Sequence, residues 1–130
     1  MRAIVAVLLL GSATAAEDGP LLLVGGGRMP DAVRQRLVEL AGGAKAKIVV
    51  IPTASTAADD PKQEASFRQD WDKLKPASVT VLHTRDRKTA DDPAFARPLT
   101  DATAVWLGGG DQSKLTAAYR GTLVEKAIGE

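Results

Sequence analysis

An apolar, strand-like run ends in three consecutive glycines, and two polar residues and a helix follow at once. The run is Ala104–Leu107, the glycines are Gly108–Gly110, and the polar residues are Asp111 and Gln112. Parallel sheets bind ligands at the carboxyl ends of their strands, where such turns present backbone N–H groups. Glycine permits close approach of the backbone to a ligand, and the N-terminus of a helix attracts negative charge. The turn is therefore a candidate ligand-binding site with backbone N–H donors beside polar side chains.

A second triple glycine, Gly25–Gly27, follows the apolar run Leu21–Val24. Neither triple glycine has the G-x-G-x-x-G spacing followed by an acidic residue about 20 positions later, so dinucleotide binding is disfavoured. No G-x-x-x-x-G-K-[ST] motif is present either, which excludes a P-loop. For both turns the alternative interpretation is a tight connection from strand to loop that binds no ligand.

The residue types exclude several kinds of chemistry. The sequence has no cysteine and a single histidine, His83, so thiolate catalysis, disulfides and a zinc site built from these residues are excluded within it. We therefore predict no metal and no cofactor. His83 ends a predicted strand, but no serine lies in a G-x-S-x-G-like elbow that it could activate. We interpret His83 as a solvated or structural residue.

The remaining polar clusters have simple structural interpretations. Ser113 is predicted to cap the helix that it begins, and Ser55 lies in a polar loop. The charged run at residues 85–88 is interpreted as solvated surface. The adjacent pairs at residues 59–60 and 91–92 each precede a proline, which is typical of turn and helix-capping positions.

The first 16 residues have the features of a secretory signal. Met1 and Arg2 give a positive start, Ala3–Leu10 is apolar, and small residues at 11–16 suit cleavage after Ala15 or Ala16. The apolar run is shorter than the roughly 20 residues that span a bilayer, so no stable membrane anchor is expected after cleavage. We expect a secreted or periplasmic protein; the alternative is that this run forms a buried first element.

Beyond the signal, predicted strands and helices alternate over residues 17–130. Apolar runs predict strands at 21–24, 47–51, 78–82 and 102–107, and amphipathic patterns predict helices at 30–41, 62–74, 113–120 and 121–130. Residues 84–98 carry two prolines and are predicted to be a loop with one helical turn at most. This alternation predicts an α/β domain with a parallel sheet and helices on both faces.

Three segments, taken in order, resemble the cyanophycinase branch of the S51 serine peptidases. They are Leu23–Gly27, then Glu39–Gly43 with Ile48–Ser55, and finally Val105–Gln112 with the Gly-Thr pair at 121–122. The resemblance extends from about residue 21 to the end. It implies part of a three-layer αβα sandwich with a mostly parallel sheet, like that of class I glutamine amidotransferases. Residues 17–130 would then be the N-terminal part of the peptidase domain.

The resemblance also implies a function and a set of site residues. Cyanophycinases are serine-type hydrolases that act on β-aspartyl-arginine peptides, so an aspartyl peptide or a cyanophycin-like substrate is expected. The glycines matching Gly109 and Gly110 supply N–H groups to the oxyanion, and the residue matching Gln112 lines the substrate pocket. We assign the following residues to substrate binding: Asp111, Gln112, Gly26, Gly27, Thr53 and Ser55.

The sequence departs from the family pattern in one respect. The family nucleophile lies in a G-T-S-A-G-A-type elbow after the helix that follows Gln112, with a histidine further on, and neither occurs in these 130 residues. We expect this chain alone to be inactive. Its exposed strand edge favours a homo-oligomer, and its net charge of +1 gives no reason to expect a nucleic-acid partner.

Two other functions remain open from the residues. One is a non-catalytic ligand-binding or interaction domain that keeps the same fold and the same sheet edge. The other is a domain like the glutamine amidotransferases, with a cysteine nucleophile downstream. The exported, cysteine-free start makes the second less favourable.

Overall fold

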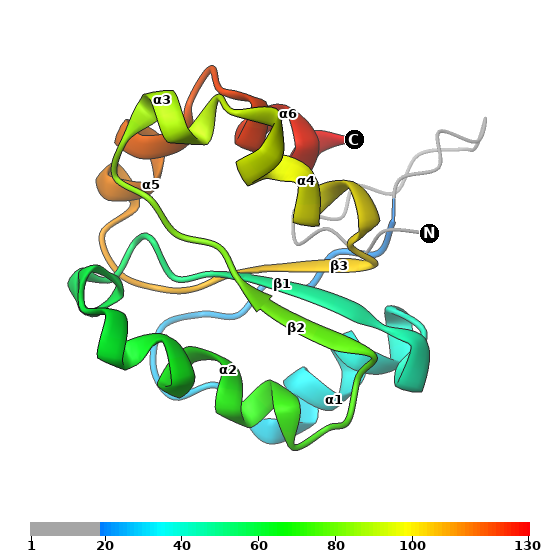
Figure 1. Ribbon diagram of the computed structural model, residues 1–130. Coiled ribbons are helices and arrows are strands. Elements are labelled where there is room, and N and C mark those ends of the chain that lie inside the picture. The colour runs from blue at the N-terminus through cyan, green and yellow to red at the C-terminus, as the bar shows by residue number, and fades with distance from the viewer. Residues whose placement is uncertain (1–18) are drawn as a thin grey trace, which may run out of the picture.

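A parallel three-stranded sheet forms the centre of the protein (Figure 1). A computed structural model describes residues 19–130, and the predicted signal at residues 1–16 lies outside them. The strands are β1 (Lys47–Ile51), β2 (Ser78–Val81) and β3 (Ala104–Leu107), in the order β2-β1-β3. Ile48 is in register with Val79 on one side and with Ala104 on the other. The two strand ends that carry predicted site residues, β1 and β3, therefore lie side by side.

Helices cover both faces of the sheet (Figure 1). On one face lie α1 (Asp31–Leu40) and α2 (Glu64–Asp72). On the other lie α3 (Arg87–Ala90), α4 (Pro93–Asp101), α5 (Gln112–Tyr119) and α6 (Leu123–Gly129). Short 3₁₀ turns are present at Gly43–Lys45, Thr56–Asp59 and Pro61–Gln63. The predicted three-layer α/β architecture with a parallel sheet is thus confirmed, as a partial form of the fold.

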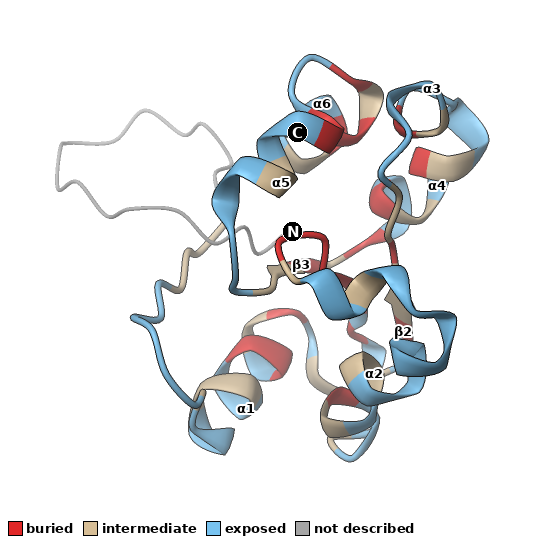
Figure 2. Cartoon of the chain, turned by 90° about the vertical axis from the view of Figure 1, so that its left-hand side faces the viewer, coloured by how far each residue is buried: buried red, intermediate tan, exposed pale blue. Residues whose placement is uncertain are grey.

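Strand β1 is buried on both faces, which its continuous apolar sequence requires. Ile48 and Val50 point to the side of α1 and α2, where they pack in one cluster with Leu37 and Trp71. Val49 and Ile51 point to the opposite side and join a second cluster, which includes Leu99, Tyr119 and Val124. Successive side chains of β1 therefore point to opposite faces of the sheet and contribute to both hydrophobic cores. Figure 2 shows the buried residues concentrated at the sheet and on the inner faces of the helices.

An aromatic pair closes the core on the side of α1 and α2. The rings of Trp71 and Trp106 lie 5.6 Å apart between centroids at an interplanar angle of 51°. The Arg34 guanidinium lies 5.9 Å from the Trp71 ring centroid, within the range of a cation–π contact. This stack connects α1, α2 and β3 immediately before the glycine turn.

The structure corrects two expectations about secondary structure. Leu21–Val24 is extended but forms no strand among the described residues, and Leu23 and Val24 are 65% and 37% exposed. An apolar run becomes a strand only where a neighbouring ladder accepts its backbone hydrogen bonds. Residues 84–98 were expected to be a loop, yet they contain α3 and most of α4.

Capping aspartates and the position of one proline explain the second correction. The Asp86 carboxylate accepts hydrogen bonds from the backbone N–H groups of Lys88 and Thr89, and the Asp92 carboxylate accepts one from Ala94. Pro93 occupies the first turn of α4, where a missing N–H costs nothing. The capping role predicted for Asp92 is correct, and Asp86 caps in the same way.

No helix within residues 19–130 combines the length and the apolar character needed to cross a membrane.

Replacing Trp71 by alanine tests the aromatic closure of this core. Trp71 is 3% exposed, and the substitution would leave a cavity beside Trp106. We expect the free energy of unfolding to fall by about 3–5 kcal/mol, measured by urea denaturation, and Trp71→Phe to lose less. A loss below about 1 kcal/mol for Trp71→Ala would contradict this packing.

Candidate functional site

Two backbone hydrogen bonds fasten the glycine turn after β3 to the segment after β1. The Gly108 N–H donates to the Ile51 carbonyl at 3.0 Å, and the Asp111 N–H donates to the Ala54 carbonyl at 2.9 Å. Between them, Gly110 has φ +142°, and a Cβ on this residue would collide with the Ala54 carbonyl group. The turn therefore requires glycine at position 110 for both conformation and space.

The two amides between these hydrogen bonds belong to exposed residues. Gly109 and Gly110 are exposed, and within residues 19–130 neither N–H donates to another group of the protein. A Cβ on Gly109 would meet no atom within 4 Å. The amides predicted to bind an oxyanion are thus accessible and unpaired in the described part of the chain, while their neighbours hold the turn in place.

The helix after the turn begins with a different cap from the one predicted. The Asp111 carboxylate accepts hydrogen bonds from the Ser113 backbone N–H at 2.9 Å and from the Ser113 hydroxyl at 2.6 Å. Asp111 therefore caps α5, and Ser113 is a donor to the cap rather than the cap itself. These hydrogen bonds, led by that of the Ser113 hydroxyl, lower the pKa of Asp111 below its usual range.

A cavity of about 710 Å³ opens beside the turn, and both triple glycines line it. Gly25–Gly27 approach from one side and Gly108–Gly110 from the other, although more than 80 residues separate them in sequence. Gln112 and Arg34 also line this cavity. The structure thus brings together five of the residues predicted for the site: Gly26, Gly27, Gly109, Gly110 and Gln112.

The other three predicted residues lie elsewhere. Asp111 is committed to capping α5, and neither Asp111 nor Thr53 lines the cavity. Ser55 lines a smaller neighbouring cavity of about 260 Å³, together with Gly108 and Gly109. The Ser55 hydroxyl accepts a hydrogen bond from the Ala57 N–H and so begins the 3₁₀ turn at Thr56–Asp59.

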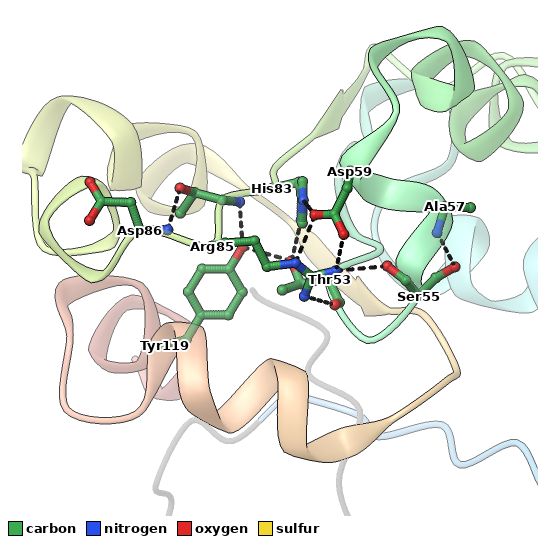
Figure 3. Close-up of polar contacts among 9 residues, drawn as sticks. Thr53, Ser55, Ala57, Asp59, His83, Arg85, Asp86 and Tyr119 are labelled. Atoms are coloured by element: carbon green, nitrogen blue, oxygen red, sulfur yellow. Dashed lines mark hydrogen bonds and ion pairs between the residues drawn. The ribbon is translucent and has the colours of Figure 1, made fainter.

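Thr53 belongs to a buried hydrogen-bond network (Figure 3). Its side chain is fully buried, and its hydroxyl lies 2.7 Å from the Tyr119 hydroxyl and 3.0 Å from His83 Nδ1. The Thr84 N–H donates to the Tyr119 hydroxyl at 3.1 Å. The network joins the ends of β1 and β2 to α5, which gives both Thr53 and His83 a structural role and keeps the Thr53 hydroxyl out of reach of a substrate.

The charged partners of this network were missed in the sequence. The Asp59 carboxylate lies 3.1 Å from His83 Nε2 and 2.8 Å from Arg85 Nε. Arg85 also donates to the backbone carbonyls of Thr53 and Ser55 (Figure 3). Arg85 is exposed, as the surface interpretation predicts, and Asp59 lies in a 3₁₀ turn, but the sequence did not indicate that their side chains pair with each other. A usable signal was that Thr53 and His83 each follow a neighbouring strand, which places them at one edge of the sheet.

Arg87 is likewise exposed, and its guanidinium donates to the carbonyls of Ala117 and Arg120 at the end of α5. Among the aspartates, Asp60 caps the 3₁₀ turn at Pro61–Gln63, as predicted. Asp91 instead accepts a hydrogen bond from the Leu123 N–H at the start of α6.

This arrangement can stabilise negative charge. The exposed amides of Gly109 and Gly110 border one cavity and favour an anion there, whereas the N-terminus of α5 is already capped by Asp111. The two serines that line the smaller cavity have engaged hydroxyls, since Ser55 accepts from Ala57 and Ser66 donates to the Gln63 carbonyl at 2.6 Å. Within residues 19–130, no cluster of His, Asp and Glu side chains could hold a metal ion.

Comparison with known proteins places these features in a family. The model of peptidase family S51 matches residues 21–130. Among solved structures, the fold is similar to the crystal structure of a peptidase from an acI-B1 Actinobacterium, with a TM-score of 0.60 and 29% sequence identity. The match covers 77% of this chain and 43% of that chain, so the present sequence spans less than half the length of that peptidase.

Alanine substitutions at adjacent glycines test the geometry of the turn. Gly110→Ala forces a Cβ against the Ala54 carbonyl group at a φ of +142°, whereas Gly109→Ala enters open space. We expect Gly110→Ala to lower the free energy of unfolding by about 1–3 kcal/mol. Gly109→Ala should change it by less than about 0.5 kcal/mol. Equal stability of the two variants in urea denaturation would contradict the described turn.

The Asp59–Arg85 contact predicts a pH response. The hydrogen bond from Arg85 is the main cause of the lowered pKa of Asp59, and the hydrogen bond from His83 adds to it against desolvation. Because the folded pKa lies below the ordinary value of 3.8, the ionised carboxylate stabilises the fold above that value. This contribution is lost as the pH falls through the folded pKa.

Arg85→Gln should therefore raise the titration midpoint of the Asp59 carboxyl carbon, followed by NMR. Arg36→Gln is a suitable control, because Arg36 is exposed and pairs with Glu39, also on α1, and not with Asp59. An unchanged Asp59 midpoint in Arg85→Gln would show that the contact does not govern its ionisation.

Proposed function

Because the chain belongs to peptidase family S51, we propose that residues 19–130 supply the oxyanion-binding part of a serine-type peptidase. The proposed reaction is hydrolysis of aspartyl peptide bonds, with β-aspartyl-arginine peptides as the substrate, as in cyanophycinases. The observation that supports this proposal is the pair of exposed, unpaired amides at Gly109 and Gly110, which open onto a cavity of about 710 Å³.

The turn suits the charge that develops during acyl transfer. When a nucleophile attacks a peptide carbonyl, negative charge collects on the oxygen, and fixed N–H donors stabilise it without reorganising. The hydrogen bonds of Gly108 and Asp111 hold both ends of the turn, so its amides are already in position. Removal of one such donor typically lowers kcat by about 10²–10³.

We propose that the nucleophile and its base come from a segment outside residues 19–130. The hydroxyls of Ser55 and Ser66 are engaged in hydrogen bonds, and that of Thr53 is buried in the network with His83 and Tyr119. The 130-residue chain alone should therefore bind product without hydrolysing peptide. A non-catalytic binding domain of the same fold would show the same binding, but would acquire no activity when a serine elbow is supplied.

Export is also part of the proposal, on the strength of the signal-like sequence at residues 1–16. The open edge of β3, which pairs only with β1 among the described strands, supports a homo-oligomer or pairing with a further strand.

The experiment compares two substitutions at one exposed position. Gly109→Pro removes the N–H donor, and Gly109→Ala keeps the N–H and adds a methyl group in open space. With ¹⁵N-labelled protein and β-aspartyl-arginine, whose carboxylates stand in for the oxyanion, we expect saturable shifts of the Gly109 and Gly110 amides. Gly109→Pro should raise the Kd by about tenfold or more, because a hydrogen bond to a charged group is lost.

Gly109→Ala should bind like the unmodified chain. Binding that is equally strong in Gly109→Pro, or the lack of any shift at the two glycines, would remove the support for an oxyanion site. Hydrolysis of β-aspartyl peptides by the 130-residue chain alone would instead overturn the proposed external nucleophile.

A further inference from the structure

One charged side chain lines the cavity that holds the glycine turn. Arg34, on α1, borders both the cavity of about 710 Å³ and the smaller one of about 260 Å³. Its side chain is only 16% exposed. In the part of the chain that the structure describes, the rest of the larger cavity's lining is uncharged, and much of it is glycine or apolar. Arg34 is thus the one charged side chain among the described residues that line this cavity.

The hydrogen-bonding capacity of this guanidinium is only partly used. Nη1 donates to Asp31 at 3.0 Å, and Nη2 lies 3.5 Å from Asp70. The Nε atom is buried and has no partner among the described residues. Buried polar atoms in native proteins almost always have a partner, so an unpaired one requires an explanation. A ligand that accepts hydrogen bonds in the cavity would provide it.

The existing partners can be exchanged at little cost. Asp31 is 87% exposed, and its pairing with Arg34 is a surface ion pair of the kind that contributes little to stability. Asp70 is shared, since it also accepts a shorter hydrogen bond, of 2.7 Å, from Lys73. Arg34 can therefore turn toward a ligand without leaving a buried carboxylate unpaired.

The side chain of Arg34 also has an aromatic neighbour. Its guanidinium lies against Trp71, which in turn packs against Trp106 of β3. Trp106 lines both cavities and lies two positions before Gly108, the first residue of the glycine turn. The cation and the exposed amides are thus positioned by the same strand, at two places around one cavity.

We infer that Arg34 binds a carboxylate group of the ligand and thereby selects acyl groups that carry a second acidic function. A planar guanidinium matches the two oxygens of a carboxylate and forms stronger hydrogen bonds with it than with a neutral amide. Arg34 and Gly109 line the same two cavities, so an acyl group with its carbonyl at Gly109 would direct a neighbouring carboxylate toward Arg34. An uncharged acyl group leaves the guanidinium without this partner. Only the position of the acyl carbonyl rests on the proposed function; the binding of a carboxylate does not.

The test measures binding of succinate to the full chain, with succinamide as the uncharged probe of equal length. Addition of succinate should shift the Nε–Hε resonance of Arg34, assigned by its loss in Arg34→Lys, and the amides of Gly109 and Gly110. Arg34→Gln should raise the Kd for succinate by about tenfold or more. Arg36→Gln, on the same helix, exposed and outside both cavities, is the matched control and should bind normally.

Two results would overturn the inference. One is that succinate leaves the Arg34 resonance of the unmodified chain unmoved, which needs no variant to fold. The other is that folded Arg34→Gln, checked by circular dichroism, binds succinate as tightly as Arg36→Gln does. If succinate binds through Arg34 while β-aspartyl-arginine leaves the glycine amides unmoved, the carboxylate site stands and the proposed peptidase function fails.

Discussion

The site depends on the docking of one turn against the neighbouring strand. The bonds from Gly108 to Ile51 and from Asp111 to Ala54 continue the contact between β3 and β1 beyond the ends of the strands. These two bonds use the N–H groups of Gly108 and Asp111, whereas Gly109 and Gly110 between them are exposed. A turn that was not fastened at both ends would have to be ordered on binding, and that entropy would oppose any stabilisation of charge.

The two layers of helices contribute differently to this turn. On the side of α1 and α2, Arg34, Trp71 and Trp106 form a stack that ends at the cavity. On the side of α5, Tyr119 holds the end of β1 through Thr53. The first layer thus brings charge to the cavity, and the second fixes the segment on which the turn is docked. Asp59 and Arg85 reinforce the second layer from the surface.

The family relationship agrees with this division of roles. The match to peptidase family S51 runs from residue 21 to residue 130, and it includes both glycine turns. The similar actinobacterial peptidase is more than twice as long as the part that matches. The described residues hold groups suited to receiving negative charge, and the proposed nucleophile and base lie outside residues 19–130.

The sequence by itself determined the layered α/β fold and the two glycine turns, because strand and helix periodicities and glycine runs are local signals. It failed at Leu21–Val24, since a strand needs a neighbouring strand to pair with, and at α4, where Asp92 caps the helix and Pro93 suits its first turn. Only the tertiary structure decided which residues share the cavity. Arg34 and Gly109 both line this cavity, whereas Thr53 is buried away from it. Packing between segments that are distant in sequence decides where each of these residues lies.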